Sequence, residues 1–158
     1  MDRGDFQGAE RVLRELKGSE ASFQLGKFLA ERGRGKEARR ILVKLLSDRD
    51  HKTAAFRLLA QGSMEYGDWE SARAHLLDLE KAEPQDPGVA KALADCLIRL
   101  GDSLGALSAA QRGLALAPDD RDLAKLMSDA AEAAAASAAR THAGLPKPRT
   151  QRDGRRMR

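Results

Sequence analysis

One short motif recurs along this chain at a fixed interval of 34 residues. The motif is a glycine, then Asp or Arg, three further residues and an alanine, and it begins at Gly33, Gly67 and Gly101. Two prolines, Pro84 and Pro118, repeat the interval, and an earlier copy of the motif begins 29 residues before the first of these glycines, at Gly4. A fixed period of this length indicates a repeat architecture, in which one supersecondary unit stacks on the next.

Each interval contains two helical patterns separated by the glycine. Around Gly67, apolar or small residues recur three and four positions apart, first at Phe56, Leu59, Ala60 and Ser63 and then at Ala72, Leu76 and Leu79. The glycine suits the left-handed backbone conformation that ends a helix, and Asp68 can cap the next helix by accepting from its free N–H groups. A proline such as Pro84 stands where the second helix must end. The unit is therefore predicted to be a pair of antiparallel helices.

The composition favours helices throughout the chain. The apolar set makes up 42% of the residues and charged residues 33%, which suffices for a core, whereas Val, Ile and Thr together number only eight. So few β-branched residues cannot furnish a sheet. A single cysteine, Cys96, excludes an intramolecular disulfide and a multi-cysteine zinc site, and no run of about 18 apolar residues is present that would span a membrane. The sequence therefore predicts an all-α fold.

These units resemble the tetratricopeptide repeat family, whose pattern has Leu-Gly in the first helix, Ala and an aromatic residue in the second, and a final Pro. The residues that carry the resemblance are Leu25, Gly26, Leu29, Ala38 and Leu42, then Phe56, Leu59, Ala60, Ala72, Leu76 and Pro84, and then Leu93, Ala94, Leu97, Ala106 and Pro118. Two positions depart from the pattern, because Asp50 stands in place of a proline and Ala110 in place of an aromatic residue. Three units in register, with no insertion between them, carry the resemblance.

The resemblance implies a right-handed α-solenoid of antiparallel helix pairs, covering roughly residues 1–140. We expect a partial first repeat with its second helix only over residues 1–18, followed by full repeats over 19–52, 53–86 and 87–120. An alanine-rich helix over 121–140 would cap the array, and 141–158 would be a disordered basic tail.

The expected first helix lacks a partner on one side, so Val12, Leu13 and Leu16 would be partly exposed. Repeat arrays normally end in helices with polar outer faces. Two interpretations stay open. The chain is a piece of a longer protein or its start is set too late, or the apolar face is a natural docking or dimerisation surface.

Positive charge is concentrated in the expected tail. The chain has a net charge of +4, and residues 141–158 hold six basic residues against the single acid Asp153, so that the tail carries +5 and residues 1–140 carry −1. A folded body without excess positive charge is not expected to bind nucleic acid through its surface. The tail offers a weaker alternative, namely contact with nucleic acid or an acidic membrane.

The sequence offers no convincing catalytic or metal site. His51, His75 and His142 are far apart and lack metal-ligand spacing, and Cys96 lies in a helical pattern without an activating base, as a small core residue would. The glycine-rich stretch beginning at Gly33 has neither the spacer nor the preceding strand of a phosphate-binding loop. We therefore expect no enzyme activity, no cofactor, no metal and no small-molecule substrate.

By the same resemblance, the first helix of each pair lines a concave groove for a peptide. The candidate groove residues are Phe23, Lys27, Arg57, Gln61, Met64, Lys91, Asp95, Ile98 and Arg99. Met64 and Ile98 would anchor an apolar side chain of the ligand. Lys91 and Asp95, four residues apart, are equally consistent with an ordinary solvent-exposed pair. Arg57 has no acidic residue four positions further on, so we expect it to bind a ligand carboxylate.

The sequence thus predicts a non-catalytic scaffold that binds a partner protein or peptide in its groove. The alternative is a tetratricopeptide repeat segment of a larger enzyme or regulatory protein, whose catalytic part lies outside this chain. Dimerisation through the uncovered N-terminal helix is a further possibility. The absence of a signal-peptide pattern favours the cytoplasm, although an export signal upstream of this start stays open.

Overall fold

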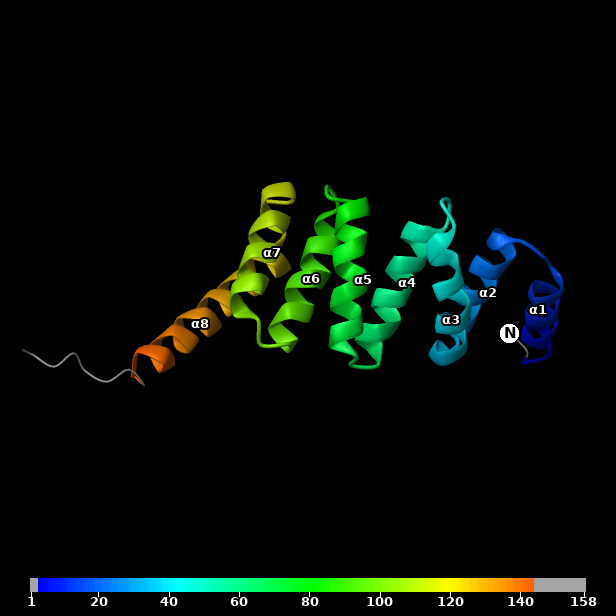
Figure 1. The fold of residues 1–158 in the computed structure, drawn as a ribbon, viewed down its shortest axis with the longest axis horizontal. Helices are drawn as coiled ribbons and strands as arrows, with labels where there is room; N and C mark the ends of the chain where they lie inside the picture. The colour runs from blue at the N-terminus through cyan, green and yellow to red at the C-terminus, as the bar shows by residue number, and fades with distance from the viewer. Residues whose placement is uncertain (1–2, 144–158) are drawn as a thin grey trace, which may run out of the picture.

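A computed structural model describes residues 3–143 of the chain, and all of its regular structure in that range is helical. The helices are α1 (Arg3–Glu15), α2 (Ser19–Glu31), α3 (Gly35–Leu42), the short 3₁₀ helix η1 (Val43–Ser47), α4 (Lys52–Glu65), α5 (Trp69–Ala82), α6 (Pro87–Arg99), α7 (Ser103–Leu116) and α8 (Arg121–Ala143). They stand side by side in one elongated row that begins with α1 and ends with α8 (Figure 1). The predicted all-α solenoid of helix pairs is confirmed.

The turns inside the pairs follow from the repeated glycines. Gly33, Gly67 and Gly101 have φ of 72°, 71° and 77°, a conformation that only glycine adopts without strain, and they end α2, α4 and α6. The carboxylates of Asp68 and Asp102 then accept from backbone N–H groups in the first turn of α5 and α7, as predicted for helix caps. The first pair has Arg34 at this position and no side-chain cap.

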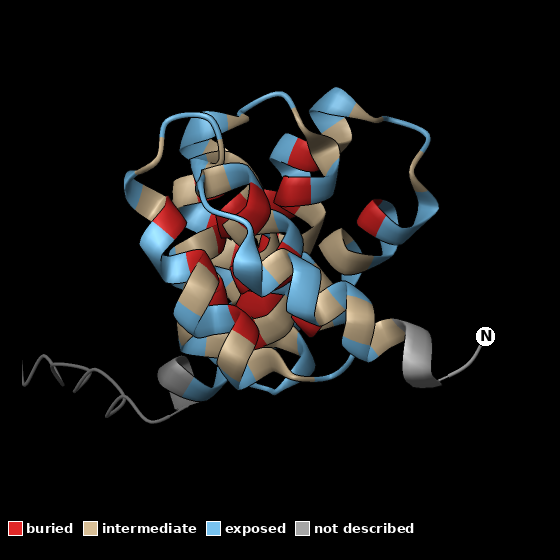
Figure 2. Cartoon of the chain, turned by 90° about the vertical axis from the view of Figure 1, so that its right-hand side faces the viewer, coloured by how far each residue is buried: buried red, intermediate tan, exposed pale blue. Residues whose placement is uncertain are grey.

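The helices approach each other closely where the repeat places small residues. Ala38, Ala72 and Ala106 are at most 3% exposed. Buried residues, coloured red in Figure 2, lie toward the middle of the array, and their side chains form separate clusters along it. One cluster joins α2, α3, η1 and α4, and another runs from α4 to α8, so α4 lies between the two halves of the core.

The C-terminal helix α8 covers the last pair. Leu123 is fully buried, and Leu126 and Met127 pack against the cluster beneath, as the sequence predicted. Its bounds differ from the predicted range 121–140, because the helix runs to Ala143. Alanine-rich sequence has a high helix propensity, and three residues assigned to the tail are therefore helical. The rest of the predicted tail, residues 144–158, lies outside the described residues.

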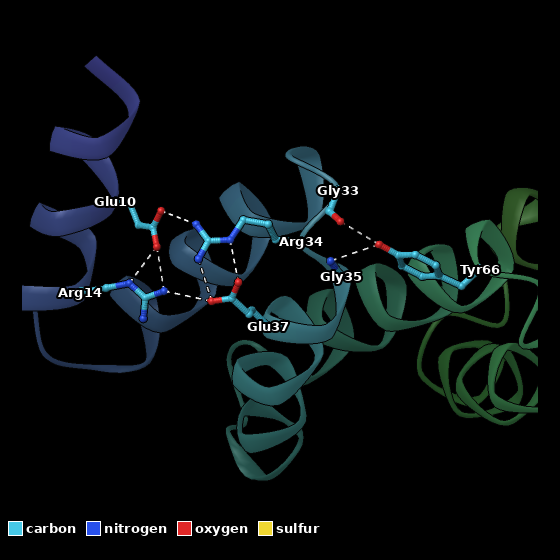
Figure 3. A network of polar contacts seen from close by, with 7 residues as sticks. All are labelled: Glu10, Arg14, Gly33, Arg34, Gly35, Glu37 and Tyr66. Atoms are coloured by element: carbon cyan, nitrogen blue, oxygen red, sulfur yellow. Dashed lines mark hydrogen bonds and ion pairs between the residues drawn. The ribbon is translucent and has the colours of Figure 1, made fainter. Parts of the chain in front are cut away.

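The N-terminal helix α1 is attached to the array largely through charged side chains. Glu10 accepts from the guanidinium groups of both Arg14 and Arg34, and Arg34 also pairs with Glu37 at 2.7 Å (Figure 3). Val12 on this helix and Leu16, directly after its end, are 51% and 56% exposed, while Leu13 is half-buried. The predicted uncovered face of this helix is thus present in the structure.

Candidate functional site

The predicted groove residues come from the first helix of each pair. Phe23 and Lys27 lie on α2, the residues from Arg57 to Met64 on α4, and those from Lys91 to Arg99 on α6. The repeat places the same helix positions at each level of the array, so that neighbouring levels present comparable side chains. The structure does not bring all nine together into one site.

Three of the nine line a hollow between α4 and α6, with α5 behind it. This α4–α6 hollow has a volume of about 270 Å³, and its lining residues are Arg57, Ala60, Gln61, Met64, Glu65, Leu76, Leu79, Gly88, Val89 and Ala92. Apolar side chains form most of the lining, and the polar members lie on α4. Gln61 donates from its side-chain amide to Glu65 at 3.1 Å, which orients both side chains along that helix. The hollow suits an apolar side chain rather than a charged one.

The remaining predicted residues do not line this hollow. The Phe23 ring contacts the His51 ring in a tilted arrangement, with ring centroids 5.5 Å apart, and packs on the first core cluster. Ile98 is half-buried against the second cluster and so contributes to the core as well as to the surface. Lys27 is exposed on α2. These residues therefore lie outside the hollow and do not join it into one continuous groove.

Arg57, predicted to bind a ligand carboxylate, already has two carboxylate partners within the chain. Its guanidinium pairs with Asp86 at 2.8 Å and also with Glu83, both from the loop that leads into α6. The Asp86 carboxylate raises the pKa of Arg57, and the Arg57 guanidinium lowers the pKa of Asp86. Arg57 already has carboxylate partners within the chain, and a ligand would have to displace them.

The expected surface pair between Lys91 and Asp95 is also absent from the described ion pairs. The Lys91 ammonium instead meets Asp122 at 2.7 Å and Asp120 at 3.2 Å, and the Asp122 carboxylate raises its pKa. Asp95 faces Arg99 at 3.7 Å. The side chain of Lys91 thus reaches from α6 to the start of α8, where Asp120 caps the helix and Asp122 lies in its first turn.

Arg57 and Lys91 thus make the same contact one repeat apart. Each basic side chain bonds an aspartate 29 residues further on, Asp86 or Asp120, which caps the following helix. We call this pair of contacts the ion-pair ladder. Sequence reasoning missed it because only contacts within one helix were considered, although the spacing of 29 repeats with the period and was visible in the sequence.

The remaining candidates of chemical interest have structural roles. Arg99 lies over the ring of Trp69, 5.5 Å from its centroid. Cys96 is fully buried, its thiol donates to the carbonyl of Trp69 at 3.2 Å, and burial raises its pKa, so it is a core residue as predicted. Across residues 3–143, the side chains of His, Cys, Asp and Glu form no group of three that would hold a metal ion. In the same range, no helix has the length and apolar content that a bilayer span requires.

Comparison with known proteins supports the repeat interpretation at the level of family and fold. The family model described as the tetratricopeptide repeat matches residues 63–130, from the end of α4 into α8. A search of curated protein sequences finds no match.

Several solved structures have the same fold. The MamA structure designated AMB-1 is 18% identical, with a TM-score of 0.74 over 90% of this chain and 79% of that one. Another MamA crystal structure is 17% identical, with a TM-score of 0.75 over 89% of this chain and 79% of that one. A structure of the UNC-45 chaperone, which binds and folds muscle myosin, is 16% identical. Its TM-score is 0.68, and the match covers 80% of this chain but 14% of the chaperone chain. At these identities the likeness shows the fold alone.

Proposed function

Since this chain belongs to the tetratricopeptide repeat family, we propose that it is a non-catalytic scaffold that binds a peptide segment of a partner protein. The α4–α6 hollow is the observation that supports the proposal. It offers an apolar surface of about 270 Å³ on the helices that carry the predicted groove residues. A hollow of this size and lining takes one apolar side chain of the partner.

The ion-pair ladder gives this surface its rigidity. Arg57 and Lys91 each join one first helix to the cap of the next, and Arg57 borders the hollow. Side chains that are already ordered lose little conformational entropy when a ligand binds. In this proposal Arg57, held by Asp86, orders one edge of the hollow, and Met64 contacts the apolar side chain of the peptide.

A selection from a random peptide library on the full chain tests the proposal. Peptides that bind would be measured by calorimetry against the wild type and two variants of equal chemistry, Ala92→Arg in the hollow and Ala115→Arg on the exposed face of α7. We expect Ala92→Arg to weaken binding by roughly tenfold or more, and Ala115→Arg to leave it unchanged. Equal affinity for both variants, with helical circular dichroism intact, would remove the hollow from the proposal.

The exposed face of α1 supports a second contact. Val12 in the last turn of α1 and Leu16 directly after it are each about half exposed, whereas repeat arrays normally end in polar outer faces. We propose that a second copy of this chain covers them. Light scattering on the full chain and on Leu16→Glu tests this, because a dimer should become a monomer. A monomeric wild type would favour the alternative that further segments of a larger enzyme or regulatory protein cover the face.

The proposed scaffold role includes no catalysis. We propose no enzyme activity, no cofactor and no small-molecule substrate, since the candidate residues act as core, caps or ion pairs. Binding of nucleic acid is not expected from residues 1–140, whose net charge is −1. We place the protein in the cytoplasm.

A further inference from the structure

A second hollow lies on the other side of α4, between this helix and the first helix pair. We call it the α3–α4 pocket. Its volume is about 240 Å³, and its lining comprises Ala30, Gly35, Lys36, Ala38, Arg39, Leu42, Leu58, Leu59, Gly62, Ser63, Glu65, Tyr66 and Asp68. None of the nine predicted groove residues lines it. It lies where the core divides into its two halves.

The corresponding position in the next junction of the array carries a large aromatic residue. One repeat further on, Trp69 stands where the first pair has Gly35, and its side chain packs against the buried cluster of α5, α6 and α7. Two other positions are smaller in the first junction as well, because Gly62 and Ser63 correspond to Cys96 and Leu97. The second junction thus holds an indole at a place where the first junction provides no large side chain from the corresponding helix position.

Tyr66 closes part of this space from outside without filling it. Its hydroxyl donates to the carbonyl of Gly33 at 2.9 Å and accepts from the N–H of Gly35 at 3.3 Å, as Figure 3 shows. The side chain is 61% exposed, and a Cβ atom at Gly35 would lie only 2.3 Å from its ring. The tyrosine therefore spans the turn at the edge of the pocket and requires glycine beneath it.

The size of the pocket limits what it can hold. An apolar cavity of about 150 Å³ already binds benzene, and pockets for whole small molecules begin at about 300 Å³. The volume of about 240 Å³ lies between these limits and suits one bicyclic aromatic group.

The charges around the pocket match a neutral aromatic ligand. The lining holds two cations, Lys36 and Arg39, and two carboxylates, Glu65 and Asp68, so that a charged ligand gains no net attraction. Arg39 meets Asp68 at 3.4 Å across two half-exposed side chains, and Lys36 forms no ion pair with another described residue. Cations favour the face of an aromatic ring, and a carboxylate accepts from an indole N–H.

We propose that the α3–α4 pocket binds a tryptophan side chain presented by a partner polypeptide, as a separate site from the α4–α6 hollow. The proposal rests on the proposed function for its source of ligand, namely a peptide. An indole from the partner would then lie beside the Tyr66 ring, which occupies the start of the place that Trp69 takes in the second junction.

Gly62 offers a variant that fills the pocket without distorting the helix. It lies inside α4, and a Cβ atom there would meet no atom within 4 Å apart from the backbone of its own helix. Gly62→Leu should therefore place a side chain in the pocket and leave the fold intact. Gly8 in α1 has equally open surroundings, so Gly8→Leu is a matched control at a distance from the pocket.

The experiment is a titration of the isotope-labelled full chain with N-acetyl-tryptophan amide, followed by nuclear magnetic resonance. We expect saturable shifts of the amide signals of Gly35, Gly62 and Tyr66, with millimolar affinity. Gly62→Leu should weaken binding by roughly tenfold or more, and Gly8→Leu should leave it unchanged. N-acetyl-leucine amide should bind at least several-fold more weakly, and free indole no more tightly than the amide. Ala30→Leu serves as a second filling variant if Gly62→Leu unfolds.

Two results would overturn the proposal. The first is the absence of saturable shifts at these amides, or shifts that persist in both filling variants. The second is free indole that binds more tightly than the amide, since the ligand would then be a free aromatic molecule. The proposed function is tested separately, through Ala92→Arg at the other hollow. A chain that binds peptides there but not the amide here keeps its function and loses this site.

Discussion

The first and second junctions of the array are built from corresponding helices in the same register, and they differ in where the large aromatic residue comes from. At the second junction Trp69 extends from the start of α5 into the core, opposite Leu100. At the first junction the start of α3 is Gly35, and the opposite position carries Tyr66, which lies mostly exposed over the turn. Both junctions keep a hollow beside these residues, of about 240 Å³ at the first and about 440 Å³ at the second, and they differ in which aromatic side chain lies next to it.

This difference shows that the repeat fixes the helices but leaves the space between pairs open to variation. The glycine turns, the caps and the small residues at Ala38 and Ala72 determine how the helices meet. The residue one position after the cap, Gly35 or Trp69, changes which side chain lies beside the hollow at each junction. A binding site can therefore arise inside a repeat array without any change to its architecture.

The largest expected effect on stability comes from removing the indole of Trp69 from the second junction. Trp69→Ala should lower the free energy of unfolding by roughly 2–3 kcal/mol, somewhat less than the cost of about 3–5 kcal/mol for a fully buried tryptophan, because Trp69 is only half-buried. Urea unfolding followed by circular dichroism measures the change. Leu77→Ala on the exposed side of the same helix is the control, with an expected loss below about 0.5 kcal/mol.

The same variant sharpens the comparison between the junctions. If the two junctions differ only in the aromatic side chain at the start of the second helix, indole should bind to Trp69→Ala. Binding should then restore part of the lost stability by mass action. A variant that loses stability but gains no response to indole would show that the second junction collapses when it is emptied.

Two glycines provide an effect of intermediate size. Gly62 faces open space in the pocket, so Gly62→Ala should stabilise the chain by about 1 kcal/mol through helix propensity. Gly113 in α7 is buried, and a Cβ atom there would lie 2.7 Å from the fully buried Leu123. The overpacking of roughly 1–3 kcal/mol should outweigh the same gain in propensity, so Gly113→Ala should destabilise. Midpoints of urea unfolding that shift upward for Gly62→Ala and downward for Gly113→Ala would support the assignment of open space at the first junction.

The sequence predicted the features that depend on local chemistry and on the period. The glycine turns, the caps at Asp68 and Asp102, and the helix ends before Pro84 and Pro118 all follow from residues close to one another in the chain. The pairing of Arg57 within the chain was not predicted, because its partners lie 26 and 29 residues away. The α3–α4 pocket was not predicted, because it results from three small residues on two different helices.

A smaller effect distinguishes the junctions by their polar contacts. The ion-pair ladder links α4 to the cap of α6, and α6 to the cap of α8, whereas Phe23 on α2 makes a ring contact instead. Arg57→Met and Lys91→Met should each lower the melting temperature slightly at low salt. This loss of melting temperature should be smaller in roughly 1 M NaCl, because the Debye length is then only about 3 Å and exposed ion pairs are strongly screened.

Lys27→Met is the matched control for the ladder, since Lys27 is exposed on α2 and forms no ion pair within the described part of the chain. Its melting temperature should be close to that of the wild type at both salt concentrations. A salt response in this control equal to that of the ladder variants would trace the effect to net charge instead of to the contacts.

The smallest effect separates two histidines by the sign of their pH dependence. His51, before α4, bonds Glu20 and Asp48 at 2.8 Å each, and the Glu20 carboxylate raises its pKa above 6.5. This contribution to stability is present below pH 6.5 and is lost as the pH rises through the folded pKa. His75 in α5 has a pKa lowered by burial, so its contribution is present above pH 6.5 and is lost at lower pH. Asp48, whose pKa is about 2, stays ionised across this window.

Unfolding measurements at about pH 5.5 and pH 8.5 therefore test both histidines against each other. His51→Gln should lose stability mainly at the lower pH, because the charged imidazole makes its contacts there. His75→Gln should be less sensitive to acid than the wild type, since no buried imidazole then has to take up a proton. If both variants changed the pH dependence in the same direction, the assignment of one charged and one neutral histidine in neighbouring repeats would be wrong.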